Sequence, residues 1–229
     1  MSKARTESVA DLMERAEASL RRRAWFEAER LAAKALSMAR SEDEFEAMAR
    51  ILLPLQEARR QRLAEAFEVK KVKVVAEAPN EQTRVTPGVH LVEPPLVGAD
   101  ARRFRLLALE QEVPVAVVCR EPITRLNECP VVAIGPVTIR ARIDPPKKPS
   151  APTSAWMARA LEQLGDHAIA NLDSGLDLIK RIDHLLNCLE SHPDHEKLHQ
   201  ELAELCREAA AKGLRTPPPS VPAGYEGDD

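Results

Sequence analysis

Apolar residues recur every three to four positions along the first part of the chain, which is the spacing of one face of an α-helix. Leu12, Ala16 and Leu20 form the first such stripe, and two further runs follow it. We therefore expect a helical region over residues 1–68. Pro54 lies inside the third run and lacks the N–H of a helical hydrogen bond, so it predicts a kink or a break there.

The next part of the chain, residues 69–144, consists of short runs rich in valine and isoleucine. Such β-branched residues favour strands. We expect strands at residues 69–75, 89–92, 113–119, 131–134 and 136–143, and a helix over residues 99–111. The strand–helix–strand portion from residue 89 to residue 119 predicts a parallel crossover in a small mixed sheet.

A proline-rich stretch at residues 145–153 predicts a linker. Helical periodicity returns over residues 154–213, where we expect three helices, and Ser191 with Asp194 predicts the cap of the last one. The end of the chain, residues 214–229, is rich in proline and acidic residues, which predicts a disordered tail. The expected fold class is α+β: a helical hairpin with a long kinked helix, a central mixed α/β sheet, a C-terminal three-helix region and a tail.

Residues 12–40 resemble one tetratricopeptide repeat (TPR). The resemblance is carried by Trp25-Phe26-Glu27-Ala28, then Ala32 and Ala35-Leu36, with the small residue Ala16 in the preceding helix. In that family, small residues at such positions let two antiparallel helices pack closely. The resemblance implies a TPR-like helical hairpin at the start of the chain.

The resemblance covers about an eighth of the chain, and it has departures. Ser19 stands where the family prefers Tyr, Arg40 stands where it prefers Pro, and no second clear copy follows. The family binds peptides and proteins, so the resemblance implies the same here. It places four residues on the groove-facing side of the first helix: Met13, Glu17, Leu20 and Arg21.

Composition narrows the function classes. The chain has 229 residues, of which 44% are apolar and 30% charged, with a net charge of −3. No run reaches the roughly 18 apolar residues of a membrane span, and the first residues lack the apolar core of a secretory leader. The four cysteines have no CxxC spacing, which favours free, buried thiols. We therefore expect a cytoplasmic protein with no membrane partner.

The near-neutral total hides an uneven distribution of charge. Residues 69–150 carry 13 basic and 9 acidic side chains, whereas residues 151–229 carry 7 basic and 14 acidic ones. One interpretation is ordinary surface variation. The other is that the acidic C-terminal helices pack on the basic centre.

Several kinds of catalytic motif are missing. The chain has only 8 glycines and contains no glycine-rich phosphate loop, no GxSxG and no HExxH. We expect no cofactor, and the preferred hypothesis is a non-enzymatic protein–protein interaction or scaffold protein whose partner is a protein or peptide.

An alternative hypothesis is a ligand-binding or enzymatic centre at the end of the strand over residues 113–119. Cys119, Arg120 and Glu121 lie there, and the carboxyl ends of parallel strands are where ligands bind in open α/β sheets. A thiolate at Cys119 would need activation by Arg120 or His90.

Two further patterns are weaker. The cluster of His184, Cys188, His192, His195 and His199 includes two histidines four residues apart, but it fits no standard zinc spacing, so we expect no metal site. Nucleic-acid binding through the basic central region is a second alternative. That region has Phe104 as its one aromatic residue, whereas single-stranded nucleic acids stack on several, so nucleic acid is not the expected partner.

Overall fold

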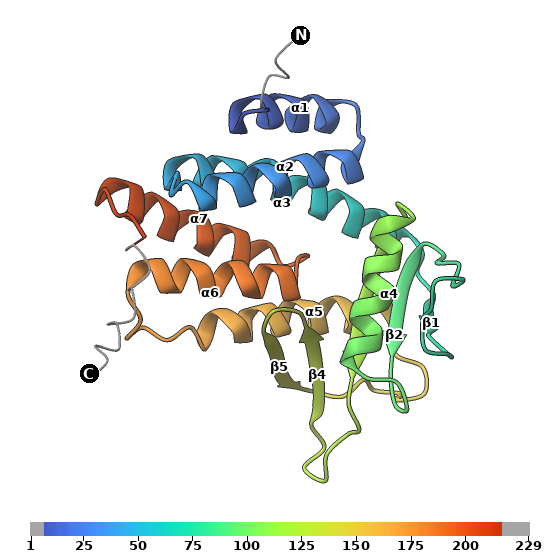
Figure 1. Ribbon diagram of the computed structural model, residues 1–229. Coiled ribbons are helices and arrows are strands. Elements are labelled where there is room, and N and C mark those ends of the chain that lie inside the picture. Colours follow the sequence, from blue (N-terminus) through green and yellow to red (C-terminus); the bar gives the residue numbers. More distant parts are fainter. Residues whose placement is uncertain (1–6, 217–229) are drawn as a thin grey trace, which may run out of the picture.

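A computed structural model gives the structure of the protein and describes residues 7–216. Its fold is α+β, as predicted, and combines a stack of helices with one mixed sheet (Figure 1). The helices are α1 (Val9–Arg21), α2 (Trp25–Ser41), α3 (Phe45–Glu68), α4 (Gly98–Glu110), α5 (Ser154–Ala170), α6 (Leu178–Ser191) and α7 (Glu196–Ala211). The strands are β1 (Val72–Val74), β2 (Gly88–Val92), β3 (Val115–Arg120), β4 (Cys129–Ile134) and β5 (Thr138–Ile143). No helix within the described residues has the length and apolar character that crossing a bilayer requires.

The sheet has the strand order β1-β2-β3-β4-β5. The pairs β1–β2 and β2–β3 are parallel, whereas the pairs β3–β4 and β4–β5 are antiparallel. The β2–α4–β3 unit is the parallel crossover that the sequence predicts. Alternate residues of β2 and β3 face opposite sides, because successive side chains of a strand alternate. Val92 and Cys119 pack with α4, whereas Leu91 and Val118 join the main core with α3 and α5.

The helical stack contains small residues in its first two helices. Ala16, Ala28, Ala32 and Ala35 are completely buried, and α1 and α2 pack against each other. On its other side α2 packs against α3, and α3 in turn packs against α7 (Figure 1). The C-terminal helices thus contact both the N-terminal helices and the sheet. One hydrophobic core runs through all three regions of the chain.

Three details differ from the sequence-based expectation. Pro54 does not split the third helix, which is continuous through it, and Pro54 itself is buried. The last helix is capped by His195 and not by the Ser191/Asp194 pair, because the Ser191 hydroxyl is already bonded to the carbonyl oxygens of Val137 and Asn187.

The start of the expected tail is ordered. The Thr216 N–H donates to Asp43 Oδ2 at 2.8 Å, and the Arg215 side chain donates to the Glu42 carbonyl at 2.9 Å. Residues 214–216 therefore lie against the turn between α2 and α3. The rest of the expected tail, residues 217–229, is outside the described residues.

Candidate functional site

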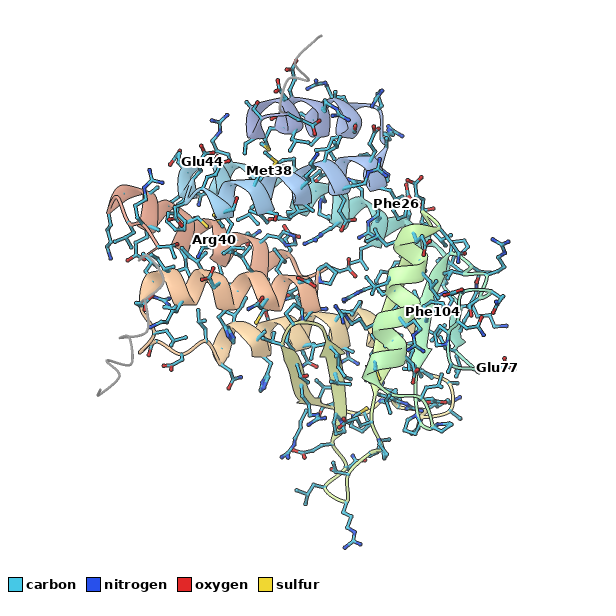
Figure 2. All side chains as sticks on the ribbon, viewed as in Figure 1. Phe26, Met38, Arg40, Glu44, Glu77 and Phe104 are labelled. Atoms are coloured by element: carbon cyan, nitrogen blue, oxygen red, sulfur yellow. The ribbon has the colours of Figure 1, made fainter. Side chains whose placement is uncertain are left out.

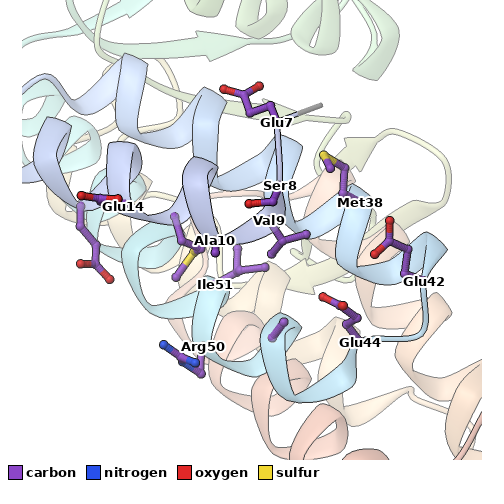
Figure 3. A pocket seen from close by; sticks show the side chains of 13 residues that line it. Glu7, Ser8, Val9, Ala10, Glu14, Met38, Glu42, Glu44, Arg50 and Ile51 are labelled. Carbon is purple, nitrogen blue, oxygen red and sulfur yellow. The ribbon is translucent and has the colours of Figure 1, made fainter. Parts of the chain in front are cut away.

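A groove lies between α1 and α3, at the end of α2, and has a volume of about 710 Å³. Figure 3 shows it from close by, with side chains from the start of α1, the end of α2 and the start of α3 around it. It exists because α1 and α3 both pack on α2 and contact each other only slightly. Apolar side chains line its interior: Val9, Ala10, Met13, Met38, Ala47 and Ile51.

The rim of this groove is strongly acidic. Five glutamates line it, at positions 7, 14, 17, 42 and 44, against the single basic residue Arg50. In Figure 3, Glu14 lies on one side of the apolar residues, and Glu42 and Glu44 lie on the other. Carboxylates on both sides of an apolar surface create a negative potential that attracts a cationic partner.

Most of these carboxylates are unpaired. Glu7 is the exception, since it forms ion pairs with Arg15 and, at 2.6 Å, with Lys34, whose hydrogen bond lowers the pKa of Glu7. Within residues 7–216, the side chains at 14, 17, 42 and 44 form no ion pair. The groove therefore keeps four negative charges that no neighbouring cation of the described chain neutralises. We call it the acidic groove.

Two of the four predicted groove residues line the acidic groove. Met13 and Glu17 do so, whereas Leu20 and Arg21 lie toward the other end of α1 and do not. The α2–α3 turn and the start of α3 also line the acidic groove, which was not predicted from the sequence. A sequence signal for this part of the groove exists: four of the six residues in Ser41-Glu42-Asp43-Glu44-Phe45-Glu46 are acidic, which indicates an unusually negative turn.

The alternative site at the end of β3 has a cavity of about 520 Å³. Cys119, Arg120 and Glu121 line it, together with prolines from the neighbouring loops. Both charged residues are engaged: Arg120 pairs with Glu93, and Glu121 accepts from Arg140 at 2.8 Å. The structure thus brings three of the four candidate residues to one cavity.

The fourth candidate, His90, does not line that cavity. Its ring lies against Phe104, with 4.7 Å between the ring centroids, and its Nε2 atom is 2.8 Å from the Thr86 carbonyl oxygen. Burial raises the pKa of the Cys119 thiol to about 12. A nucleophilic cysteine needs a lowered pKa and a nearby base. The arrangement is that of a core thiol, and the other three cysteines are also free and buried.

The histidine cluster is largely internal. His192 donates from Nε2 to the Leu161 carbonyl oxygen, and His199 lies 3.0 Å from the His195 carbonyl oxygen through Nδ1. The remaining nitrogen of His199 lies 3.2 Å from Arg59 Nη1, so it accepts from the guanidinium group. Burial lowers the pKa of both His192 and His199 to about 3. Both rings are therefore neutral at physiological pH.

These two histidines predict a loss of stability in weak acid. The unfolded chain takes up protons on them below its ordinary pKa of 6.5, while the folded chain does not until about pH 3. The contribution of these two histidines to the free energy of unfolding is thus complete above pH 6.5. It falls as the pH decreases from 6.5 toward 3. Each contributes a slope of up to about 1.4 kcal/mol per pH unit. Urea unfolding between pH 7 and pH 5.5, above the titration of ordinary carboxylates, measures it.

A matched pair of variants separates these histidines from other groups. Burial also lowers the pKa of His90 and His195. His199→Gln removes one of these four buried titrations, so the pH slope should decrease. His167→Gln, at an exposed position of α5, should leave the slope unchanged. An equal slope in the wild type and in His199→Gln would contradict the assignment.

One group of potential metal ligands occurs among the described residues. Glu162, Asp166 and His195 offer ligand atoms within 4.8 Å of one another. Lys197 already occupies this position, with its Nζ atom 2.6 Å from Glu162 Oε1 and 2.9 Å from Asp166 Oδ1. His195 also accepts the Leu198 N–H on Nδ1 at 3.2 Å, so in the neutral ring the proton sits on Nε2, the atom that faces the carboxylates. The cluster has the features of a surface ion pair beside the buried histidine that caps α7.

The basic residues of the centre are partly paired with acidic ones. Arg140 pairs with Glu121, and Arg142 lies 3.8 Å from Glu128. On α4, the Arg105 side chain donates to the carbonyl oxygens of Ser191 and Glu190. This contact between α4 and the end of α6 joins the basic centre to the acidic C-terminal region.

Comparisons with known proteins give no relative: no family model matches the chain, and neither the curated proteins nor the solved structures contain a similar one. The resemblance of residues 12–40 to a tetratricopeptide repeat therefore rests on their own sequence and on the close α1–α2 packing. Function has to be argued from the geometry.

Proposed function

We propose that the protein is a non-enzymatic interaction protein whose acidic groove binds a basic, amphipathic segment of a partner protein. The observation that carries the proposal is the set of four glutamates around an apolar interior that form no ion pair within residues 7–216. A partner segment with apolar side chains on one face and Lys or Arg at its borders matches both features. This is the recognition mode in which an amphipathic helix lies in a groove.

The apolar interior and the acidic rim of the groove have different roles in this proposal. Met13, Met38 and Ile51 provide adaptable apolar contact area, and methionine in particular fits varied side chains. The carboxylates at 14 and 17 on one side, and at 42 and 44 on the other, set the charge and orientation of the ligand. Charge complementarity of this kind governs specificity and association rate more than the affinity itself.

The experiment uses a fluorescent synthetic peptide with leucine at every third or fourth position and lysine between, and measures its binding to the full chain by anisotropy. Binding should weaken as salt rises, because exposed charges are screened. A peptide with glutamate in place of lysine should not bind. Equal binding of the two peptides would overturn the proposal.

A charge-reversed variant tests the site itself. Glu14→Lys with Glu17→Lys should weaken binding of the lysine peptide by about tenfold or more, since like charges across an interface are strongly unfavourable. The matched control is Glu204→Lys with Glu208→Lys, which makes the same charge change at exposed positions of α7. If the control weakens binding as much as the α1 variant, net charge explains the binding and the acidic groove does not.

A further inference from the structure

A second polar cluster lies where α2, α3, α4 and the α6–α7 turn meet. Glu29 of α2 forms ion pairs with Arg59 at 2.9 Å and Arg62 at 2.7 Å. The side chains of Glu29 and Arg62 are only 7% and 8% exposed. Asp194, in the α6–α7 turn, lies 3.8 Å from Arg62, and Arg105 reaches the cluster from α4. We call this the arginine cluster.

The arginine cluster has an excess of positive charge. It contains three guanidinium groups but only two carboxylates, and its neighbour His199 is neutral because burial holds its pKa near 3. At its edge, Arg102 lies 3.7 Å from Glu190, so these two charges offset each other. One positive charge is left without a counter-charge in a partly buried position, where an unpaired ion is costly.

The hydrogen bonds of the arginine cluster are also incomplete. Arg62 Nε is 2.7 Å from Glu29 Oε2, yet neither atom makes a hydrogen bond of acceptable geometry, so the contact is an ion pair only. Asp194 and Arg62 at 3.8 Å are likewise too far apart for a hydrogen bond. Guanidinium donors therefore remain available in the cluster for a further acceptor.

A cavity of about 120 Å³ adjoins these groups. That space exceeds what one water molecule needs and admits a group of several atoms. The charged part of its lining comes from Glu29, Arg59, Arg62, Arg105, Asp194 and Glu190, the partner of Arg102. The other part is apolar and includes Leu106 and Leu109 of α4, which are 48% and 41% exposed. The cavity thus has a wall of arginines and carboxylates and an apolar wall, and part of its lining is open to solvent.

We propose that this cavity binds a small organic carboxylate. The carboxylate group would accept hydrogen bonds from Arg62 and Arg105, and its single negative charge would bring the arginine cluster to neutrality. A phosphate dianion carries two negative charges, so it would leave the arginine cluster with a net charge of about −1. An apolar tail would lie along the exposed leucines of α4. Burial and the positive charges of neighbouring arginines lower the pKa of Arg105, a cost that a bound anion would relieve.

This site is separate from the acidic groove. Figure 2 shows Met38 and Glu44 at one end of the N-terminal helices and Phe26 at the other, and Arg62 lies over the Phe26 ring at 5.1 Å. The two sites therefore share no lining residue. Failure of one proposal leaves the other standing.

The experiment compares sodium butyrate, sodium phosphate, sodium chloride and butanol, at constant ionic strength, as additives in thermal unfolding of the full chain. Butyrate should raise the unfolding midpoint in a saturable way, by roughly 5–10 °C at a hundredfold excess over its dissociation constant. Chloride and butanol should not. An equal shift with phosphate, an equal shift with chloride, or no saturable shift with butyrate would each overturn the proposal.

Two variants locate the effect. Arg105→Gln removes one cationic donor and should abolish the butyrate shift. Leu106→Glu, at an exposed position, places a negative charge in the lining without disturbing the core, and should weaken butyrate binding by about tenfold. Leu53→Glu is the matched control, since Leu53 is 61% exposed on α3 and outside the cavity lining. A butyrate shift retained in Leu106→Glu would contradict the location.

Discussion

Replacing Glu29 by alanine is expected to destabilise the protein by about 3–5 kcal/mol, because it leaves the buried guanidinium groups of Arg59 and Arg62 without their shared carboxylate. The two arginines hold the pKa of Glu29 below its usual value even though burial, the largest influence, acts to raise it. The carboxylate is therefore ionised in the folded protein. Urea unfolding of the variant and the wild type at pH 7 measures the difference.

A matched control is available on the next helix. Glu57 forms ion pairs with Arg60 at an exposed position of α3, so Glu57→Ala should cost less than about 1 kcal/mol. The contrast compares a glutamate buried between two arginines with a more exposed glutamate beside one arginine. Similar losses in both variants would show that Glu29 contributes no more than a surface ion pair.

Gly165→Ala is the second change with a large expected effect. A Cβ atom at Gly165 would lie 2.1 Å from His195 Cγ, so the α5 helix and the His195 ring cannot both keep their positions. We expect a loss of about 1–3 kcal/mol, as for overpacking of a core. The sign of the change in unfolding free energy is informative. In an unobstructed helix interior, replacing glycine by alanine stabilises the protein by up to about 1 kcal/mol.

A double-mutant cycle tests the assigned partner. In a His195→Ala background the ring is gone, and Gly165→Ala should then cost far less than it does in the wild type. Gly175→Ala is the control, since its Cβ would meet only Asp173 Oδ1, at 3.1 Å. Additive losses in the cycle would mean that the strain comes from somewhere other than the His195 ring.

Local periodicity was enough to predict the type and order of the elements. The valine-rich runs at residues 89–92 and 113–119 became β2 and β3, and their parallel pairing follows from the helix between them. Of the two expected effects of Pro54, the break does not occur, because α2 and α7 pack along a continuous α3. The hydrogen bond that Pro54 cannot donate is a single local loss of stability. Packing against the neighbouring helices stabilises α3 along its whole length.

The sites were only partly accessible from the sequence. Met13 and Glu17 could be proposed as groove residues because both lie on one predicted helix, in the segment that resembles a tetratricopeptide repeat. Glu42 and Glu44 could not, since their position depends on how the α2–α3 turn folds back toward α1. The arginine cluster was missed altogether. Arg59 and Arg62 look like solvated helix residues until Glu29 and Asp194, far away in the sequence, come against them.

The packing of α3 against α7 has a consequence for synthesis of the chain on the ribosome. About 130 residues separate the end of α3 from the start of α7. At a translation rate of roughly 5–20 residues per second, α7 is synthesised on the order of 6–25 s after α3. Until then, the side of α3 that packs against α7 has no partner. During that interval the growing chain exposes the apolar residues that α7 later buries. We therefore expect the nascent chain to be most prone to aggregation in the interval before α7 is made.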